Sequence, residues 1–411
     1  MAMLPIVSAL KHHKTTVVLV ALEIALTCAI VTNALFLIRD RLAFMHMTTG
    51  VADNELVWVR TQTLDLGQEA DKDSHAGVVA ADLAALRGLP GVESVAMTNA
   101  LPLGGSYSST VVYRRPGDKS DSLSNVVEYL GSPGMLRTLG ISLSEGRDFQ
   151  PREYSDYQTF GQKSPPPTAV IVTRSFAQQM WPGEDPLGKP IYLGEQGEHA
   201  TYVVGVAGHL LNPAINKYQG IDRGMILPVR QVRDNSAYVL RVRPDARASV
   251  ARAIPGALQQ VDPARKIEAH VYTDTIAQYF QGDRAMVWLL LVVIGCLLTL
   301  TALGVVGLSS FWVQQRTRTI GIRRAIGATR HDILRYFLAE NFLIVSLGIV
   351  AGSAGAVGLN LWLMHHYELH RMPLSWLPIG ALVLWLLGQL AVLGPALRAA
   401  AVPPVVATRS V

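Results

Sequence analysis

One segment of this 411-residue chain has the residue spacing of a phosphate-binding loop. Gly183 and Gly188 enclose four residues and Lys189 follows, as in the pattern G-x-x-x-x-G-K. Such a loop needs a preceding strand, a following helix whose N–H groups face the phosphate, and a Ser or Thr that holds magnesium. Here we expect a helix before the loop and a strand after it, and Pro190 stands in place of the Ser or Thr. The sequence therefore predicts a surface turn and gives no visible ATP site.

Other catalytic patterns are absent from the sequence. It contains no H-E-x-x-H, no G-x-S-x-G and no C-x-x-C. The neighbouring histidines His365 and His366 would point to different faces of a helix, so they cannot chelate one ion together. We therefore expect a chain that is not an enzyme, with no catalytic residue, no cofactor of its own and no metal site.

The composition favours a membrane protein. Half of the residues are hydrophobic and 16% are charged, whereas an ordinary soluble protein has roughly a quarter charged residues. This balance excludes a disordered chain and a nucleic-acid-binding tail, so we expect no nucleic-acid partner. Four apolar runs reach the length of about 20 residues that a bilayer-crossing helix needs. They span residues 17–38, 285–313, 337–364 and 374–397.

The first run could instead be a cleaved signal peptide, but it is long for one and no small-residue cleavage site follows it. The distribution of arginines orients the runs. The segment 314–336 is rich in arginine and has Asp332 as its only acid, whereas the loop 365–373 has a single arginine. The positive-inside rule places the arginine-rich segment in the cytoplasm, with the N-terminus (1–16) and the tail (398–411). We therefore predict a four-helix membrane protein with a large external domain, residues 39–284, inserted between helices one and two.

The external domain has the pattern of a mixed α+β fold. Strands are expected at 57–59 and 93–97, with a helix at 78–86 between them, which makes a β-α-β unit. Further strands and helices alternate with turn residues up to residue 242. A run of three prolines, 165–167, indicates an internal loop or linker, and two subdomains are compatible with it.

The most informative segment is the arginine-rich turn after the second run. With no stop signal before it, the second helix is expected to continue as far as Ile326, and Gly327 to take the left-handed conformation that ends helices. Thr329 would then cap the next helix, with Asp332 as its reciprocal partner. The resulting elbow would present isoleucines and arginines to the cytoplasm. Those residues are Ile320, Ile322, Ile326, Arg323 and Arg324.

Two interpretations of this elbow compete. Its arginines could enforce topology and bind anionic lipid head groups. Alternatively, the elbow could dock a partner, with Arg supplying oriented hydrogen bonds and Ile supplying buried area. The interleaving of isoleucine with arginine favours docking.

The elbow also resembles a known family. Residues 320–328, with Ile333 and Glu340 downstream, look like the signature of FtsX-like permease domains of ABC transporters. In the external segment, residues 139–149, 181–189 and 202–206 are similar to the periplasmic domain of MacB-type permeases. One departure concerns Thr319, which stands where the family usually has Glu, and its effect on the docking contact is open.

The resemblance implies the permease subunit of a type VII ABC transporter in the bacterial inner membrane. Two permease subunits, identical or different, would pair with separate cytoplasmic ATPases that bind ATP and magnesium. The elbow would be the coupling helix, and closure of the ATPases would move the periplasmic domain, a mode called mechanotransmission. Efflux or export is the implied use, with a periplasmic adaptor and an outer-membrane channel as further partners. The residues assigned to ATPase coupling are Arg318, Ile320, Gly321, Ile322, Arg323, Arg324, Ile326, Gly327 and Thr329.

Two alternatives stay open. A lipoprotein-releasing permease would share the topology and the elbow, and a membrane-anchored sensor would need no ATPase. Within the lipid, Glu23 and Glu340 are the acidic exceptions, and we expect Glu23 to face the helix bundle, toward residues 314–315 or an elbow arginine. Gly348 and Gly352 form G-x-x-x-G, which allows close helix approach either within one subunit or in a dimer.

Overall fold

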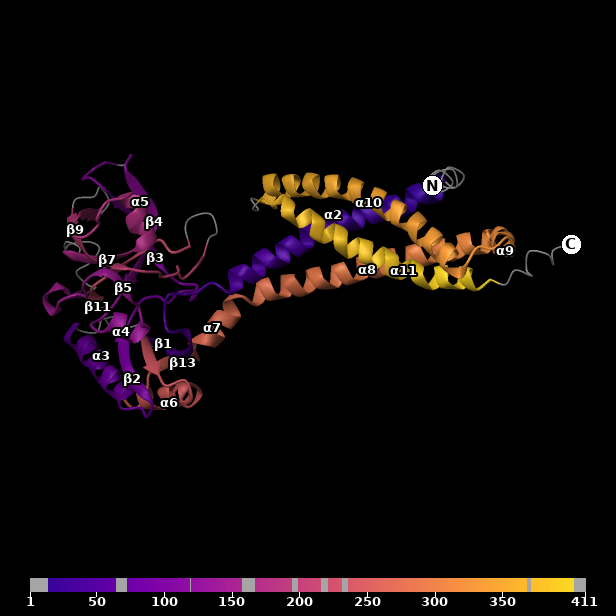
Figure 1. Ribbon diagram of the computed structural model, residues 1–411. Coiled ribbons are helices and arrows are strands. Elements are labelled where there is room, and N and C mark those ends of the chain that lie inside the picture. Colours follow the sequence, from indigo (N-terminus) through magenta and orange to yellow (C-terminus); the bar gives the residue numbers. More distant parts are fainter. Residues whose placement is uncertain are drawn as a thin grey trace. The chain divides into compact units, whose positions relative to one another are not determined.

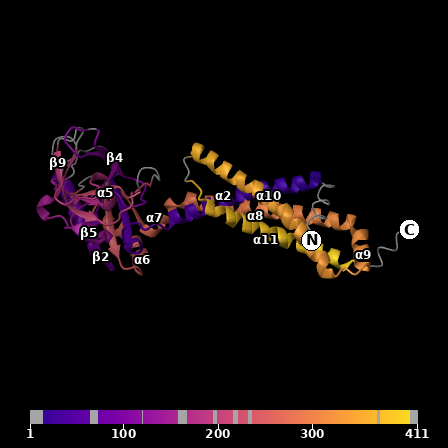
Figure 2. The same cartoon turned by 45° about the horizontal axis from the view of Figure 1, so that its top comes forward.

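The computed structural model describes the chain in eight stretches, residues 14–63, 72–118, 120–156, 167–193, 199–215, 221–230, 236–367 and 371–402. The chain forms two compact units, one made of Met1–His46 and Gly282–Val411 and the other of Met47–Gln281. Figures 1 and 2 show a helical unit and a mixed unit of strands and helices.

The helical unit contains four long apolar helices. They are α2 (Lys14–Met45), α8 (Gln281–Gln315), α10 (Arg330–Tyr367) and α11 (Leu377–Ala401). All four are long and apolar enough to cross a membrane. A short helix, α9 (Thr317–Ala325), lies between α8 and α10, and the 3-10 turn Leu374–Trp376 precedes α11. The predicted arrangement, one span before the inserted domain and three after it, is confirmed.

Glycines bring α10 directly against α2. A Cβ atom added to Gly348 would lie 2.7 Å from the Cβ of Ile24, and one added to Gly352 would lie 2.6 Å from the carbonyl oxygen of Ala25. Such distances leave no room for a side chain, so the two backbones meet through the missing Cβ atoms. The G-x-x-x-G motif is thus used for packing within one chain.

Polar side chains also join the membrane helices. The hydroxyl groups of Thr27 and Thr301 lie 2.9 Å apart and link α2 to α8. Asn33 donates to the carbonyl of Ala356 (3.0 Å) and links α2 to α10. Asn341 does the same between α10 and α11, at 2.9 Å from the carbonyl of Gly388. In a lipid environment such groups have no water to bind, so they are paired inside the bundle.

The mixed unit contains a four-stranded antiparallel sheet. Its strand order is β13 (Arg265–Val271), β1 (Leu56–Thr63), β12 (Ala237–Val242) and β2 (Val92–Met97). The helix α3 (Lys72–Arg87) connects β1 to β2, and it packs with α6 (Arg247–Gln259) on an apolar core shared with the sheet. The predicted β-α-β unit is therefore present in a split form, because β12 lies between its two strands.

A larger sheet completes the mixed unit. Its order is β5 (Leu143–Gly146), β9 (His199–Ala207), β7 (Ala169–Thr173), β10 (Gly224–Leu227), β4 (Ser122–Leu130), β3 (Ser108–Tyr113) and β8 (Pro190–Leu193). Because β8 pairs with β9 as well as with β3, six of these strands close into a ring. Pro167 directly precedes the β7 region of this sheet, and Pro165 and Pro166 lie outside the described residues.

Short elements connect these strands. The helices are α4 (Met135–Leu139), α5 (Arg174–Met180) and α7 (Tyr272–Tyr279), and the 3-10 turns are Asp53–Glu55 and Pro151–Glu153. The strands β6 (Ser155–Asp156) and β11 (Val229–Arg230) form a separate parallel pair. The chain leaves the four-stranded sheet after β2 and returns to it at β12.

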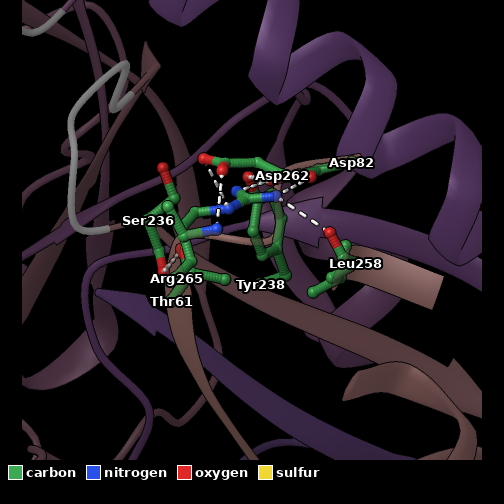
Figure 3. A network of polar contacts seen from close by, with 8 residues as sticks. Thr61, Asp82, Ser236, Tyr238, Leu258, Asp262 and Arg265 are labelled. Atoms are coloured by element: carbon green, nitrogen blue, oxygen red, sulfur yellow. Dashed lines mark hydrogen bonds and ion pairs between the residues drawn. The ribbon is translucent and has the colours of Figure 1, made fainter. Parts of the chain in front are cut away.

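A buried ion pair lies at the centre of the four-stranded sheet and its helices (Figure 3). The Arg265 guanidinium donates to both carboxylate oxygens of Asp82, at 2.7 and 2.8 Å, and the Tyr238 hydroxyl donates to the same carboxylate at 2.7 Å. Arg265 also donates to the carbonyl of Leu258 at the end of α6 (3.2 Å). These contacts join α3, α6, β12 and β13. The hydrogen bond to Asp82 raises the pKa of Arg265, and burial raises the pKa of Tyr238.

The segment that resembles a phosphate-binding loop is a turn between α5 and β8, as predicted. Its glycines Gly183 and Gly188 have φ of +76° and +74°. Lys189 forms an ion pair with Glu184 and lies over the Trp181 ring, 5.6 Å from its centroid. The lysine that would hold a phosphate in a true loop is therefore occupied by its own neighbours.

Candidate functional site

The elbow begins with a break in the helix that sequence patterns do not show. α8 ends at Gln315, and Arg316 leaves the helical region with φ −102° and ψ 11° before α9 starts. Arg316 donates through Nη1 to both carboxylate oxygens of Glu340, at 3.0 and 2.9 Å, and its guanidinium lies 5.6 Å from the Trp312 ring centroid. The prediction of a continuous helix up to Ile326 is wrong. The break coincides with this ion pair between residues far apart in sequence, which local patterns do not report.

The far end of the elbow follows the predicted capping chemistry. Gly327 has φ +108°, and its N–H donates to the carbonyl of Arg324 at 3.2 Å. Thr329 donates to the Asp332 carboxylate through its N–H (3.0 Å) and its hydroxyl (2.6 Å), and the Asp332 N–H donates back to the hydroxyl (3.2 Å). The left-handed glycine and the reciprocal cap are confirmed. The elbow is thus bounded by an ion pair before α9 and by a capping box that begins α10.

One side of α9 packs inward. Ile320 is only 4% exposed and lies in an apolar cluster with Ile333, Phe337 and Ala396. Gly321 is buried beside it. The expectation that Ile320 faces outward is therefore wrong, because its apolar side chain is buried against α10 and α11.

The opposite side of α9 is open. Ile322 is 45% exposed and Ile326 is 81% exposed, and Arg318 is exposed one turn before Ile322. An isoleucine as exposed as Ile326, on a segment bounded by the ion pair and the capping box, is suited to burial against a partner. Arg318, Ile322 and Ile326 form the outer face of the elbow.

The two adjacent arginines have different environments. The Arg323 guanidinium lies 5.2 Å from the Tyr336 ring centroid, a cation–π distance. Arg324 donates through Nη1 to the carbonyls of Ala400 (3.3 Å) and Val402 (2.5 Å) at the end of α11. Arg324 therefore ties the elbow to the last helix, which limits its availability to a partner.

The two intramembrane acids also differ. Glu340 is 1% exposed and fully engaged by Arg316. Glu23 lies in α2 against α8, where a Cβ added to Gly304 would be 2.7 Å from its Oε2 atom. Glu23 thus faces the bundle, and within the described chain neither residues 314–315 nor an elbow arginine contacts its carboxylate. The Arg316–Glu340 pair is the main feature that sequence reasoning missed. The only signal was that Arg316 follows the second predicted span and Glu340 lies near the start of the third.

Comparison with known proteins identifies the chain. Residues 17–257 match the family model described as MacB-like periplasmic core domain, and residues 291–404 match FtsX-like permease C-terminal. A multi-pass membrane protein with an inserted α+β domain is the class that the fold and these matches define. The chain belongs to the MacB-like periplasmic core domain family, and its C-terminal part matches the FtsX-like permease model.

Individual relatives are distant. The Yersinia pestis bv. Antiqua (strain Antiqua) protein described as Macrolide export ATP-binding/permease protein MacB 2 is 27% identical over 266 residues, which cover 62% of this chain and 36% of the relative. The Bacillus subtilis (strain 168) protein described as Uncharacterized ABC transporter permease YknZ is 22% identical over 330 residues, 79% of this chain and 78% of the relative. This chain thus spans about a third of the Yersinia protein and most of the Bacillus one.

A solved structure is also similar, the periplasmic region of MacB from Actinobacillus actinomycetemcomitans. It is 15% identical, covers 56% of this chain and 94% of that structure, and has a TM-score of 0.35.

Proposed function

We propose that this chain is the non-catalytic membrane subunit of an ABC transporter, driven by a separate cytoplasmic ATPase that binds ATP and magnesium. The observation that carries the proposal is the outer face of the elbow, where two isoleucines stay exposed between the ion pair of Arg316 and the capping box that begins α10. Buried area from Ile322 and Ile326 would supply affinity, and Arg318 would supply oriented hydrogen bonds. The Yersinia relative, named as an ATP-binding/permease protein, fits such a pairing of functions.

The rest of the assembly is part of the same proposal. The arginine-rich elbow would lie in the cytoplasm and the mixed unit in the periplasm, with the helices in the bacterial inner membrane. Two such permease subunits would act together, with a periplasmic adaptor and an outer-membrane channel as further partners. The helices carry few charges at depth, whereas a hydrophilic path through them would need polar lining. This favours export by mechanotransmission, in which ATPase closure is passed through the helices to the periplasmic domain.

The proposal is tested by co-purification of the ATPase with a tagged chain in mild detergent. Ile326→Glu places a charge at the centre of the outer face and should lower the recovered ATPase by about tenfold or more, the effect of losing an interface hot spot. Gln314→Glu is the matched control, because it adds the same charge at an exposed position at the end of α8. The control should recover the ATPase at wild-type yield.

Equal recovery with both variants would show that the outer face is not the docking surface. A wild-type chain that never brings down an ATPase would favour the alternative of a membrane-anchored sensor. A lipoprotein-releasing permease would give the same docking result and would differ in what the periplasmic domain binds.

A further inference from the structure

A cavity of about 230 Å³ lies between α9 and the first turns of α10. α9 and the residue before it contribute Arg316, Thr319, Ile320 and Arg323 to its wall. These positions recur at intervals of three and four residues, so they share one face of the helix. Ile322 lies about 160° around the helix from Ile320, at 100° per residue. The cavity and the outer face therefore have different centres on the elbow, and they adjoin at Thr319, which lies seven residues before Ile326.

The rim of the cavity is positively charged. Two guanidinium groups, from Arg316 and Arg323, reach it beside the side chains of Thr319 and Tyr336, and no acidic residue is among its described lining. Arg316 uses Nη1 for Glu340, which leaves its other nitrogens for another acceptor. Arg323 stacks on Tyr336 and has no carboxylate within ion-pair distance in the described chain. The rim thus offers planar N–H donors and hydroxyl groups to an anion.

The floor of the cavity is apolar. Ile320, Ile333 and Phe337 line it, and each is 4% exposed. The cavity also lies at the end of the apolar zone, because α8 has no charged residue between Arg284 and Arg316. A positive rim above an apolar floor, at this boundary, matches the head group of a phospholipid with the start of its acyl chains.

We propose that this cavity binds the phosphate head group of an anionic phospholipid from the membrane surface. Its volume is smaller than the roughly 300–1,000 Å³ of ordinary small-molecule pockets, which suits a head group better than a whole soluble ligand. The two interpretations of the elbow arginines thus apply to adjoining faces of the same elbow, the cavity for the lipid and the outer face for the partner.

The experiment measures lipid binding to the purified full chain by native mass spectrometry in detergent, with no ATPase present. The probes are phosphatidylglycerol, phosphatidylcholine and inorganic phosphate. The wild-type chain should bind one phosphatidylglycerol more tightly than phosphatidylcholine, and inorganic phosphate should not compete at equal concentration. Arg323→Gln and Thr319→Glu should each weaken phosphatidylglycerol binding by about tenfold. The first removes a guanidinium that would contact the phosphate, and the second adds a carboxylate that neutralises the arginines of the rim.

Arg330→Gln is the matched control, because it removes the same charge at an exposed position outside the cavity. It should keep wild-type binding, and circular dichroism should show that every variant retains its helices. Equal binding of the two lipids, an equal loss in Arg330→Gln, or full competition by inorganic phosphate would each overturn the proposal. Cavity variants that keep the lipid but lose a co-purifying ATPase would assign the cavity to the partner instead. Because the binding assay contains no ATPase, its outcome is independent of the proposed coupling.

Discussion

The two units of this protein use opposite means to hold their interiors together. The mixed unit buries a complete ion pair, Asp82 with Arg265, inside an otherwise apolar core. The membrane helices meet through missing side chains, at Gly348 and Gly352, and through single hydrogen bonds such as that from Asn33. The soluble core gains free energy from apolar burial, which offsets the desolvation of a charge pair. Helices in lipid have no such gain, so close contact and paired polar groups must supply their association.

The largest effect is expected where a buried charge would lose its buried partner. Asp82→Ala should lower the free energy of unfolding of the mixed unit by about 3–5 kcal/mol, because the buried Arg265 would keep only the partly exposed Asp262 as a carboxylate partner. This loss is measured by denaturant unfolding of the full chain in detergent, with hydrogen exchange of the β12 amides as the probe of the mixed unit. Asp262→Ala is the control, since Asp262 reaches the same guanidinium from a position that is 30% exposed. Its effect should stay within about 1 kcal/mol. Equal losses of unfolding free energy in Asp82→Ala and Asp262→Ala would mean that burial does not determine the contribution of the Asp82–Arg265 pair.

A smaller effect is expected from filling the space between two membrane helices. Gly352→Val should destabilise the contact of α10 with α2 by about 1–3 kcal/mol, because the added Cβ meets the backbone of Ala25, which cannot turn away. Gly358→Val is its control, since nothing lies within 4 Å of a Cβ at that position of the same helix. Thermal stability of the full chain in detergent compares the two. Equal melting temperatures for the two variants would show that the close contact at Gly352 does not stabilise the helix bundle.

The smallest effect concerns the pH dependence of the stability of the mixed unit, and it tests the cost of burying a single acid there. Burial raises the pKa of Glu128, and a hydrogen bond with Ser108 partly opposes this. The folded state therefore favours the protonated acid, so this residue's contribution to stability is greatest at low pH and is lost as pH rises through the raised pKa. Glu128→Gln should stabilise the mixed unit at pH 7, by on the order of 1 kcal/mol, and have little effect at pH 4. The exposed Glu145→Gln should show no such difference; a pH-independent gain at position 128 would contradict the assigned cause.

Features determined by local chemistry could be predicted from the sequence. The four spans follow from apolar length, the glycine at position 327 from its freedom at positive φ, and the cap of α10 from Thr329 and Asp332. The rejection of the phosphate-loop pattern at Gly183 to Lys189 rested on neighbouring elements, and the structure has those elements. Each of these inferences needs only residues within one continuous segment of the chain.

Features determined by distant partners could not be predicted. The break at Arg316 accompanies a contact with Glu340, and the inward turn of Ile320 accompanies packing on Ala396. The insertion of β12 between β1 and β2 joins segments far apart in the chain. In each case the residues can be read from the sequence, but no local pattern indicates which distant residues they contact.

The bonds from Arg324 to the last carbonyls of α11 have a practical consequence. One guanidinium donates to the final carbonyls of a helix that begins more than fifty residues later in the chain, so α9 and the end of α11 are joined. A fluorophore or fusion attached at Val402 would therefore disturb the elbow through Arg324. Labels intended to leave the elbow undisturbed belong elsewhere in the molecule.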